Sequence, residues 1–286
     1  MAFNWQTFKT RTLTAIVFVA IMSFGLLWNR WSFLALFSII HFGCWMEYQK
    51  LVGIFNTDYK RINAFHKWGI MIAGWCLLLF FTNDELMIGR VRLSHIGLYV
   101  GMASMVLLPL MILLQSRSFF LKNIAYSVTG LLYISLSLGM LVDLRNRWIE
   151  EDYQLSLTIP LLIIFTIWVN DTMAYIVGSI IGKTPLSSIS PKKTWEGTIG
   201  GAILAIVVMC LVAHFTERLS IVHTGIIAAI AAIAGTFGDL FESKLKRMAS
   251  VKDSGKLMPG HGGFLDRFDS LLFAATCCWF YVVLAF

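Results

Sequence analysis

The chain has 286 residues, of which 58% are hydrophobic and only 14% are charged, and its mean hydropathy is +0.75. A soluble domain carries about 25% charged residues, so this composition excludes both a water-soluble globule and a disordered chain. The net charge of +7 does not require nucleic acid, because in a membrane protein such a charge reflects loop topology and anionic lipid headgroups. We therefore expect an all-α polytopic membrane protein that lies in the lipid bilayer and binds no nucleic acid.

Apolar runs between charged breaks predict nine transmembrane helices, each near the roughly 20 residues that cross a bilayer. They lie at 12–28, 31–49, 67–82, 94–115, 119–142, 155–181, 198–216, 221–241 and 268–286. The first run resembles a signal peptide, but a second run follows directly after Asn29 and Arg30 without a small-residue cleavage site. We therefore interpret the first run as a membrane helix.

The distribution of Lys and Arg predicts how these helices are oriented. If the nine spans alternate in direction, 17 of the 23 Lys and Arg residues fall on one side of the membrane. By the positive-inside rule that side is the cytoplasm, which places the N-terminus in the cytoplasm and the C-terminus outside. The chain carries no hydrophilic extension, which favours a multi-pass protein of a bacterial inner (cytoplasmic) membrane.

Polar residues are concentrated in the second half of the chain. The stretches 170–197 and 235–269 place Asn, Asp, Glu, Lys, Gly and His around apolar helices, whereas the loops of the first half are short. We therefore predict an N-terminal transmembrane scaffold over 1–150 and a C-terminal catalytic domain over 151–286. The five cysteines form no C-x-x-C pair and lie in apolar stretches, so buried thiols are expected.

The sixth predicted span contains Asn170 and Asp171 directly after apolar residues. An ionisable side chain at membrane depth costs about 3 kcal/mol on insertion scales, so it should face a cavity, a partner or an ion. The alternative is that the span breaks here and that Asp171 lies in water near the interface. We favour the first interpretation.

The loop after this span combines lysines, hydroxyls and a glycine directly before a helix. Such a loop can bind phosphate through charge, hydroxyl donors and the amides of the helix N-terminus. It is not a Walker A loop, because the G-x-x-x-x-G-K-[ST] spacing is absent. The alternative is a basic cytoplasmic loop that serves topology only. The lysines and hydroxyls next to the glycine include Ser190, Lys192, Lys193 and Thr194, of which Lys192 and Lys193 are the candidate phosphate contacts.

A second polar stretch joins the last two predicted spans. Asp239 and Glu242 are three residues apart and share a face of any continuing helix, and Asp266 and Asp269 repeat this spacing. Between them lies a flexible Gly-His-Gly-Gly turn at 260–263, which can aim backbone amides at an anion. Carboxylates beside a basic, glycine-rich loop suit magnesium with polyphosphate, because Mg²⁺ prefers oxygen ligands and lysines neutralise the remaining charge. Three roles are open for His261 in this turn: contact with phosphate, action as an acid, or shaping of the turn alone.

Taken together, residues 243–269 resemble the signature of the phosphatidate cytidylyltransferases, the CDP-diacylglycerol synthases. The matching positions are Ser243, Leu245, Lys246, Arg247, Lys252, Asp253, Gly255, Pro259, His261, Gly262, Gly263, Phe264, Asp266, Arg267, Phe268 and Asp269. The segments 170–175 and 190–197 also look like that family's, whereas the N-terminal half matches only in its hydropathy. Two positions depart from the pattern. Met258 stands where relatives usually have Ile, Leu or Phe, and Thr276 stands where relatives often have a kinking proline.

The resemblance implies a Mg²⁺-assisted nucleotidyltransferase that converts CTP and phosphatidate to CDP-diacylglycerol and pyrophosphate at the cytoplasmic face. The metal ligands that it implies are Asp239, Asp266, Asp269 and Asp171. The catalytic residues would be Lys252, Asp253, His261 and Lys193. The substrate-binding residues would be Ser190, Lys192, Lys193, Thr194, Glu196, Lys246, Arg247, Lys252, Gly262, Gly263 and Arg267. The residues leave open whether a second cation such as K⁺ accompanies Mg²⁺ and whether the chain forms a homodimer.

Two other functions are compatible with parts of the sequence. A CTP-dependent polyprenol or lipid kinase would use the same nucleotide but transfer its γ-phosphate, and the long signature around His261 argues against it. An ion-coupled transporter could use Asp171 and Asp239 to bind ions. Transporters commonly show repeated halves, however, and here the polar residues are confined to one half.

Overall fold

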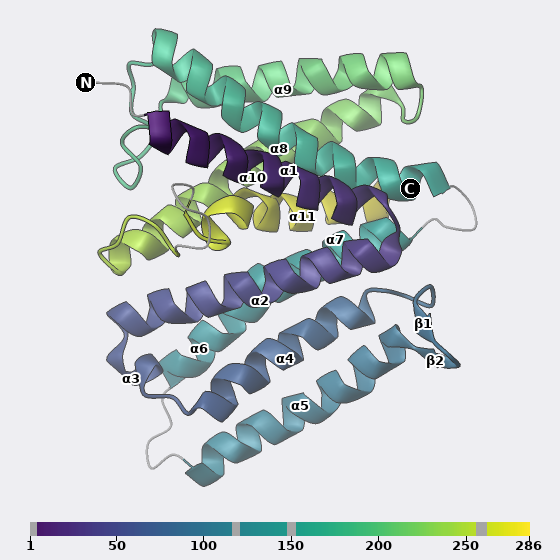
Figure 1. Cartoon of the computed structure of the whole chain (residues 1–286), viewed down its shortest axis with the longest axis vertical. Coiled ribbons are helices and arrows are strands. Elements are labelled where there is room, and N and C mark those ends of the chain that lie inside the picture. The colour runs from purple at the N-terminus through teal and green to yellow at the C-terminus, as the bar shows by residue number, and fades with distance from the viewer. Residues whose placement is uncertain (1–4, 116–120, 148–152, 256–261) are drawn as a thin grey trace. The chain divides into compact units, whose positions relative to one another are not determined.

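The computed structural model describes residues 5–115, 121–147, 153–255 and 262–286, and within these ranges it is almost entirely helical (Figure 1). Within these ranges, every predicted span falls largely on helical structure. The helical segments that are long and apolar enough to cross a membrane are Lys122–Asn146, Gln154–Ile181, Trp195–Thr216, Ile221–Met248 and Leu265–Ala285. Shorter apolar helices cover Thr12–Leu27, Ala64–Phe80 and Leu93–Leu108. The chain is therefore an all-α membrane protein, while the count of nine spans and the sides of the two termini stay predictions.

The chain divides into two compact units. Unit 1 comprises Met1–Val142 and Met248–Phe268, and unit 2 comprises Asp143–Arg247 and Asp269–Phe286. Most of the signature loop therefore belongs to the same compact unit as the N-terminal helices. The predicted division into a scaffold and a catalytic part at residue 150 concerns function and stays a prediction.

Unit 1 is built from a succession of helices with one small hairpin. Its elements are α1 (Trp5–Leu27), α2 (Arg30–Phe55), α3 (Thr57–Lys60), α4 (Ala64–Phe80), β1 (Met87–Ile88), β2 (Val91–Arg92), α5 (Leu93–Gln115), α6 (Leu121–Gly130), the π-helical segment η1 (Leu131–Leu136) and the first part of α7 (Ser137–Asn146). Strands β1 and β2 pair antiparallel. The apolar runs do not predict α3 or the hairpin, because elements of two to four residues leave no periodic signal.

Helix α2 supplies much of the core of unit 1. A capping box at Asn29 fixes its first turn. Trp45 and Tyr48 are fully buried, and the Nε1 of Trp45 donates a hydrogen bond to the Oγ of Ser135 at 2.8 Å. Gly130 permits this packing, because a Cβ there would lie 2.5 Å from the Trp45 ring. An aromatic ring that is buried with its polar atom satisfied anchors α2 against the α6–η1 segment.

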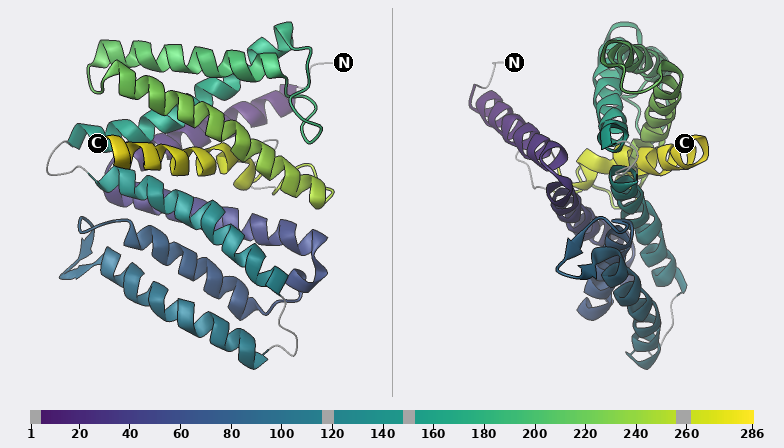
Figure 2. Two further views of the ribbon diagram at one scale, coloured as in Figure 1. Left: turned by 180° about the vertical axis from the view of Figure 1, so that it is seen from behind. Right: turned by 90° about the vertical axis from the view of Figure 1, so that its right-hand side faces the viewer.

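Helices α4 and α5 lie side by side as an antiparallel pair (Figures 1 and 2). Their close approach depends on Gly97, where an added Cβ would lie 2.4 Å from the backbone nitrogen of Phe80. In α3, Tyr59 is fully buried, and burial raises the pKa of its hydroxyl to about 12. This hydroxyl therefore stays neutral at physiological pH.

Unit 2 contains four long helices. They are α8 (Tyr153–Ile181), α9 (Trp195–Thr216), α10 (Ile221–Met248) and α11 (Leu265–Ala285), whose first residues belong to unit 1. Helix α10 continues past its predicted end at residue 241 to Met248, and Glu242 and Lys246 form an ion pair of 2.5 Å within this extension. Helix α11 begins at Leu265 instead of 268, which places Asp266 in its first turn, where a carboxylate interacts favourably with the helix dipole.

Small residues bring the helices of unit 2 close together. On α9, a Cβ at Gly197 or Gly201 would lie 2.7 Å from an atom of Ala174 on α8. On α10, a Cβ at Gly238 would lie 2.4 Å from the backbone oxygen of Asp269 on α11. Such contacts are typical of membrane helices, where tight packing and not the hydrophobic effect drives association. They fix the position of α8 along α9, a pair that Figure 2 shows from two sides. At Gly238 they bring α10 close to α11.

Candidate active site

Three aspartates of unit 2 lie close enough together to repel one another; we call them the acidic cluster. Asp171 lies on α8, Asp239 on α10 and Asp269 on α11, and each acts electrostatically on another member. Asp269 is only 8% exposed, and its Oδ1 accepts a hydrogen bond from the backbone nitrogen of Ser270 at 2.7 Å. Neighbouring carboxylates of this kind are stabilised by a nearby positive charge or by protonation.

One lysine supplies such a positive charge. Lys193 forms an ion pair with Asp239 and also acts electrostatically on the other two aspartates. Asp239 accepts a second contact, a hydrogen bond of 3.2 Å from the Oγ of Ser243 to its Oδ1. Three carboxyl groups thus lie within electrostatic range of one ammonium group.

The neighbouring Asn170 adds an acceptor to this cluster. Asn170 is buried, and its Nδ2 donates a long hydrogen bond of 3.5 Å to the Oδ1 of Asp171. Its Oδ1 has no hydrogen-bond partner among the residues that the structure describes. A buried acceptor without a partner costs about 1–3 kcal/mol, and an amide oxygen is a hard ligand like a carboxylate.

The donor types around Asn170 and the acidic cluster therefore fit a hard divalent cation. Across the described ranges, however, no three His, Cys, Asp or Glu side chains are close enough to hold a metal ion together. The three aspartates act electrostatically on one another, but their carboxylates do not surround a common point.

The loop between α8 and α9 is held in shape by its own hydrogen bonds. The Oγ1 of Thr194 caps α9 by accepting a hydrogen bond from the backbone nitrogen of Gly197 at 3.1 Å. The carboxylate of Glu196 accepts hydrogen bonds from the backbone nitrogens of Lys183 and Thr184, each at 3.2 Å. Thr194 and Glu196, both predicted substrate contacts, thus have structural roles within the loop itself.

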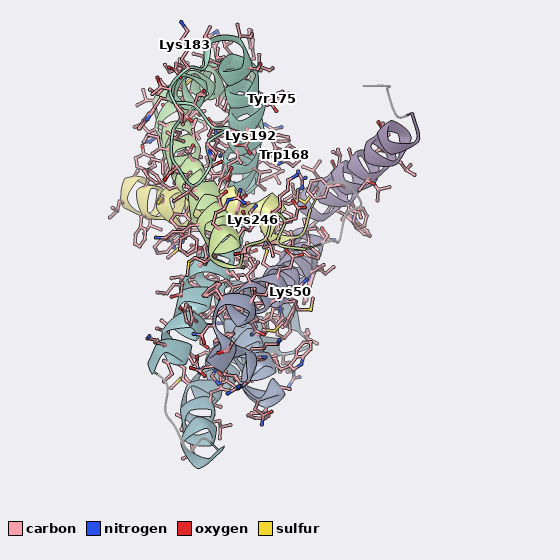
Figure 3. The ribbon with its side chains drawn as sticks, turned by 90° about the vertical axis from the view of Figure 1, so that its left-hand side faces the viewer. Lys50, Trp168, Tyr175, Lys183, Lys192 and Lys246 are labelled. Atoms are coloured by element: carbon pink, nitrogen blue, oxygen red, sulfur yellow. The ribbon has the colours of Figure 1, made fainter. Side chains whose placement is uncertain are left out.

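Residues 190–193 form a turn that contains two adjacent lysines with different surroundings. The backbone oxygen of Ser190 accepts a hydrogen bond from the backbone nitrogen of Lys193 at 3.1 Å. Lys193 reaches the acidic cluster, whereas Lys192 is exposed. Figure 3 shows Lys192 between Lys183 and Lys246 along unit 2. Of the predicted phosphate contacts in this loop, Lys192 therefore has the most open side chain.

The two predicted basic contacts on α10 both have protein partners. Lys246 pairs with Glu242, which is fully buried, at 2.5 Å. The Nε of Arg247 donates to the backbone oxygen of Ile189 at 3.5 Å and so ties the end of α10 to the α8–α9 loop. Lys246 therefore neutralises a buried acid, and Arg247 helps to place the loop that holds the lysines.

In unit 1, Asp266 organises the loop that precedes α11. Its Oδ2 accepts hydrogen bonds from the backbone nitrogen of Ser254 at 2.9 Å, from the Oγ of Ser254 at 2.8 Å and from the backbone nitrogen of Gly263 at 2.8 Å. The amide of Gly263, predicted to face a bound anion, thus donates to a carboxylate of the chain itself. The predicted role of Asp266 as a metal ligand stays a prediction, while its contacts here are with the loop.

Glu47 on α2 is a second loop-anchoring carboxylate, and the sequence patterns do not indicate it. It accepts hydrogen bonds from the backbone nitrogens of Phe264 at 3.0 Å and Leu265 at 2.9 Å, and it contacts the Oγ of Ser254 at 2.7 Å. These amides open α11, where helix N–H groups have no partner within the helix. The available signal was that Glu47 is the single acidic residue of the predicted span 31–49.

The glycines of the signature make room for the loop-anchoring carboxylates, Glu47 and Asp266. A Cβ at Gly255 would lie 2.0 Å from the Oε1 of Glu47, and one at Gly263 would lie 2.2 Å from it. Gly262 has a φ of +83°, and a Cβ there would lie 2.7 Å from the Oδ2 of Asp266. Residues with a Cβ rarely adopt such a positive φ, so the turn requires glycine at position 262.

The remaining predicted residues lie on the surface of the loop or outside the described residues. Lys252 and Asp253, both predicted to be catalytic, are exposed just before the buried Ser254. Arg267 is exposed in the first turn of α11. His261 lies outside the described residues.

Comparison with known proteins decides the family. The cytidylyltransferase family matches residues 9–285. The chain belongs to this family. The phosphatidate cytidylyltransferase of Haemophilus influenzae is 33% identical over 286 residues, which cover 92% of this chain and 94% of that protein. The phosphatidate cytidylyltransferase of Staphylococcus saprophyticus is 31% identical over 268 residues, which cover 93% and 95%. The chain aligns with about half (52%) of the Synechocystis phosphatidate cytidylyltransferase, at 40% identity over 153 residues.

As a member of the cytidylyltransferase family, the chain is a nucleotidyltransferase of a kind that generally uses a divalent metal. The match from residue 9 onward shows that the family resemblance extends through the N-terminal half, which corrects the expectation that this half matches only in its hydropathy. The contacts of Glu47 give that half a definite link to the signature loop.

Proposed function

We propose that this cytidylyltransferase converts CTP and phosphatidate to CDP-diacylglycerol and pyrophosphate. The observation that carries the proposal is the alignment with phosphatidate cytidylyltransferases over 92% and 93% of the chain. The acidic cluster and its lysine add a chemical reason, because both substrates are phosphates. Phosphatidate would come from the bilayer and CTP from the cytoplasm, in the inner membrane of a bacterium.

The reaction joins two phosphates. A phosphate oxygen of phosphatidate attacks the α-phosphorus of CTP and forms a new P–O bond, while the bond from that phosphorus to the bridging oxygen breaks. Pyrophosphate leaves with the electron pair of the broken bond. Because the nucleophile belongs to the lipid, the protein needs no covalent intermediate, and its task is to position two anions and to neutralise their charge.

Asp171, Asp239 and Asp269 are proposed to hold Mg²⁺, with the unpartnered Oδ1 of Asn170 as a further acceptor. Magnesium, when bound, neutralises phosphate charge and orients the reacting groups. Asp266 and a second cation such as K⁺ remain part of the proposal. The support for this site is the excess of three carboxylates over one lysine in unit 2.

The lysines of the α8–α9 loop are proposed to bind phosphate oxygens. Lys193 neutralises Asp239 in this structure, and a bound cation would release it to contact a phosphate. Lys192 is exposed and available to the second anion. Lys252, Asp253 and His261 are proposed to act on the nucleotide. Ser190, Arg247 and Arg267 would complete the set of polar contacts.

The test is a labelling experiment with purified protein, phosphatidate and Mg²⁺. CTP is supplied in two parallel reactions, labelled at the α-phosphorus in one and at the γ-phosphorus in the other. Cytidylyl transfer places the α-label in lipid and releases the γ-label as pyrophosphate. Appearance of the γ-label in lipid would instead identify a lipid kinase and overturn the proposal. If no label enters lipid while the protein remains folded, an ion-coupled transporter becomes the function to test.

A further inference from the structure

A pocket in unit 1 contains none of the residues predicted to bind substrate or metal. Its volume is about 540 Å³, and it lies between the second half of α2, the short helix α3 and the first half of α4. The lining residues that matter here are Met46, Lys50, Ile54, Lys60, Lys67 and Trp68.

The charge of this pocket is entirely positive. Lys50, Lys60 and Lys67 line it, and none of its lining residues is acidic. Within the described part of the chain, none of these three lysines forms an ion pair with a carboxylate. Figure 3 shows Lys50 at the surface of unit 1. Uncompensated charge in a concave site with apolar walls attracts an anion more strongly than the same charge on a flat surface.

The walls of the pocket are apolar and open. Met46, Ile54 and Trp68 are large apolar side chains that stay exposed. Tryptophan beside lysine is typical of the headgroup level of a membrane, where the ring and the lysine stem contact lipid chains and the ammonium group contacts phosphate. All three lysines also fall on the predicted cytoplasmic side. This combination suits a molecule that has both a phosphate and an apolar part.

The backbone around the pocket is fixed by hydrogen bonds. The Nε2 of Gln49 donates to the backbone oxygen of Lys67 at 3.0 Å, which joins α2 to α4. The Nζ of Lys67 donates to the backbone oxygen of Lys60 at 2.9 Å, which joins α4 to α3. Helix α3 packs against α2 at Gly53, where an added Cβ would lie 3.6 Å from the Cα of Lys60, an ordinary contact distance. The pocket therefore exists before a ligand binds, which reduces the entropy lost on binding.

We propose that this pocket binds the phosphate of an anionic glycerophospholipid that is not the substrate. The lysines contact the phosphate, and Met46 and Trp68 contact the beginning of the acyl chains. The volume lies within the roughly 300–1,000 Å³ of small-molecule sites and takes a headgroup but not a whole lipid. A free nucleotide fits less well, because it would leave the apolar walls in contact with water.

The experiment measures lipid binding to purified full-length protein by native mass spectrometry. The probes are phosphatidylglycerol, phosphatidylcholine and inorganic phosphate. The variant K50Q/K60Q removes two exposed charges, and K122Q is the matched control, because Lys122 is an exposed lysine of the same unit outside the pocket. We expect wild type to prefer phosphatidylglycerol, and we expect its affinity to fall about fivefold for each pocket lysine removed, the usual contribution of a lysine near anionic lipid.

A second variant, W68A, separates a lipid site from a simple phosphate site. It removes an apolar wall and no charge, so it should weaken phosphatidylglycerol binding while the thermal unfolding midpoint stays near that of wild type. Equal losses in K122Q and K50Q/K60Q would overturn the proposal. So would equal binding of phosphatidylcholine, or inorganic phosphate that displaces the lipid at equal concentration. Cytidylyl transfer is assayed separately, so failure of this proposal leaves the proposed function intact.

Discussion

The acidic cluster of unit 2 and the loop-anchoring carboxylates of unit 1 use the same kind of side chain for opposite purposes. In unit 1, Glu47 and Asp266 accept hydrogen bonds from backbone amides of the signature loop. In unit 2, Asp171, Asp239 and Asp269 repel one another and share Lys193. The carboxylates of the first pair are satisfied by the chain itself, whereas the second group is the one that we propose binds a cation.

Asp266 and Asp269 show this contrast over a single turn of α11. They are three residues apart, yet the Oδ2 of Asp266 receives three hydrogen bonds from the loop and Asp269 lies beside like charge. A carboxylate with its acceptors filled stabilises a loop, and one that lacks compensating charge favours binding a cation. Residue type and spacing alone do not separate these two roles, but the partners do.

The largest expected effect is loss of turnover when a member of the acidic cluster is neutralised. Asp239→Asn and Asp269→Asn should each lower cytidylyl transfer by about 100-fold or more, the scale of removing a charge contact at a reacting phosphate. The thermal unfolding midpoint should not fall for Asp269→Asn, because the change removes a repelling charge. Label transfer from CTP and thermal unfolding would be measured on the same preparations.

Asp84→Asn is the control for this comparison. Asp84 is an exposed acid of unit 1 that pairs with Arg92, so its neutralisation should leave turnover unchanged. Wild-type activity in the Asp239 and Asp269 variants would remove the acidic cluster from the proposed mechanism.

The next effect is on stability, and it tests the other side of the comparison. Glu47→Gln replaces one of the two carboxylate oxygens that face the loop by an NH₂ group. This group is a donor and cannot accept a hydrogen bond from the backbone N–H groups. Each charged hydrogen bond lost costs about 1.5–3 kcal/mol, so the free energy of unfolding should fall by roughly that amount. Denaturant unfolding would measure it, and turnover should fall because the loop is displaced.

Glu85→Gln is the matched control for Glu47. Glu85 lies in the same unit and pairs with Arg30 at 2.7 Å, but its side chain is 28% exposed. A partly exposed ion pair contributes about 0–1 kcal/mol, so this change should have little effect. Equal destabilisation by the two changes would contradict the anchoring role of Glu47.

The sequence predicts well where the helices lie, but it predicts poorly which polar side chains contact one another. The reason is physical. Apolar runs locate membrane helices because hydropathy is summed over many residues, and each predicted span falls largely on helical structure in the part of the chain that the structure describes. Polar residues such as Asp171 and Asp239 also stand out, because a charge inside an apolar span is rare. Family resemblance adds the signature around them.

What the sequence does not reveal is which distant groups meet. Glu47 contacts Ser254 and Leu265 across more than 200 residues, and no local pattern encodes such a contact. The i,i+4 spacing of Glu242 and Lys246 favours the ion pair that the structure shows, whereas the signature predicts that Lys246 binds substrate. The π-helical segment Leu131–Leu136 likewise interrupts a run that hydropathy presents as uniform.

A smaller change in stability is expected from filling the space that the signature glycines leave. Gly263→Ala places a Cβ 2.2 Å from both carboxylate oxygens of Glu47, which must move. Overpacking of this kind costs about 1–3 kcal/mol. Gly101→Ala is the matched control, because its Cβ would meet only Cys76 at 3.5 Å, an ordinary contact. Thermal unfolding should separate the two variants; equal midpoints would show that the loop adapts without loss.

The smallest effect concerns the loop that holds the lysines near the acidic cluster. Thr194→Val keeps the shape of the side chain but removes the Oγ1 that caps α9. Loss of such a cap costs about 1 kcal/mol. If Thr194 acts only on the loop, turnover at saturating CTP should change little while the unfolding midpoint falls slightly. A large rise in the KM for CTP with an unchanged midpoint would instead show that this hydroxyl binds nucleotide directly, as the family resemblance implies. The α8–α9 loop would then contribute a substrate contact beside the acidic cluster. A single polar residue could in that case both anchor a loop and bind substrate.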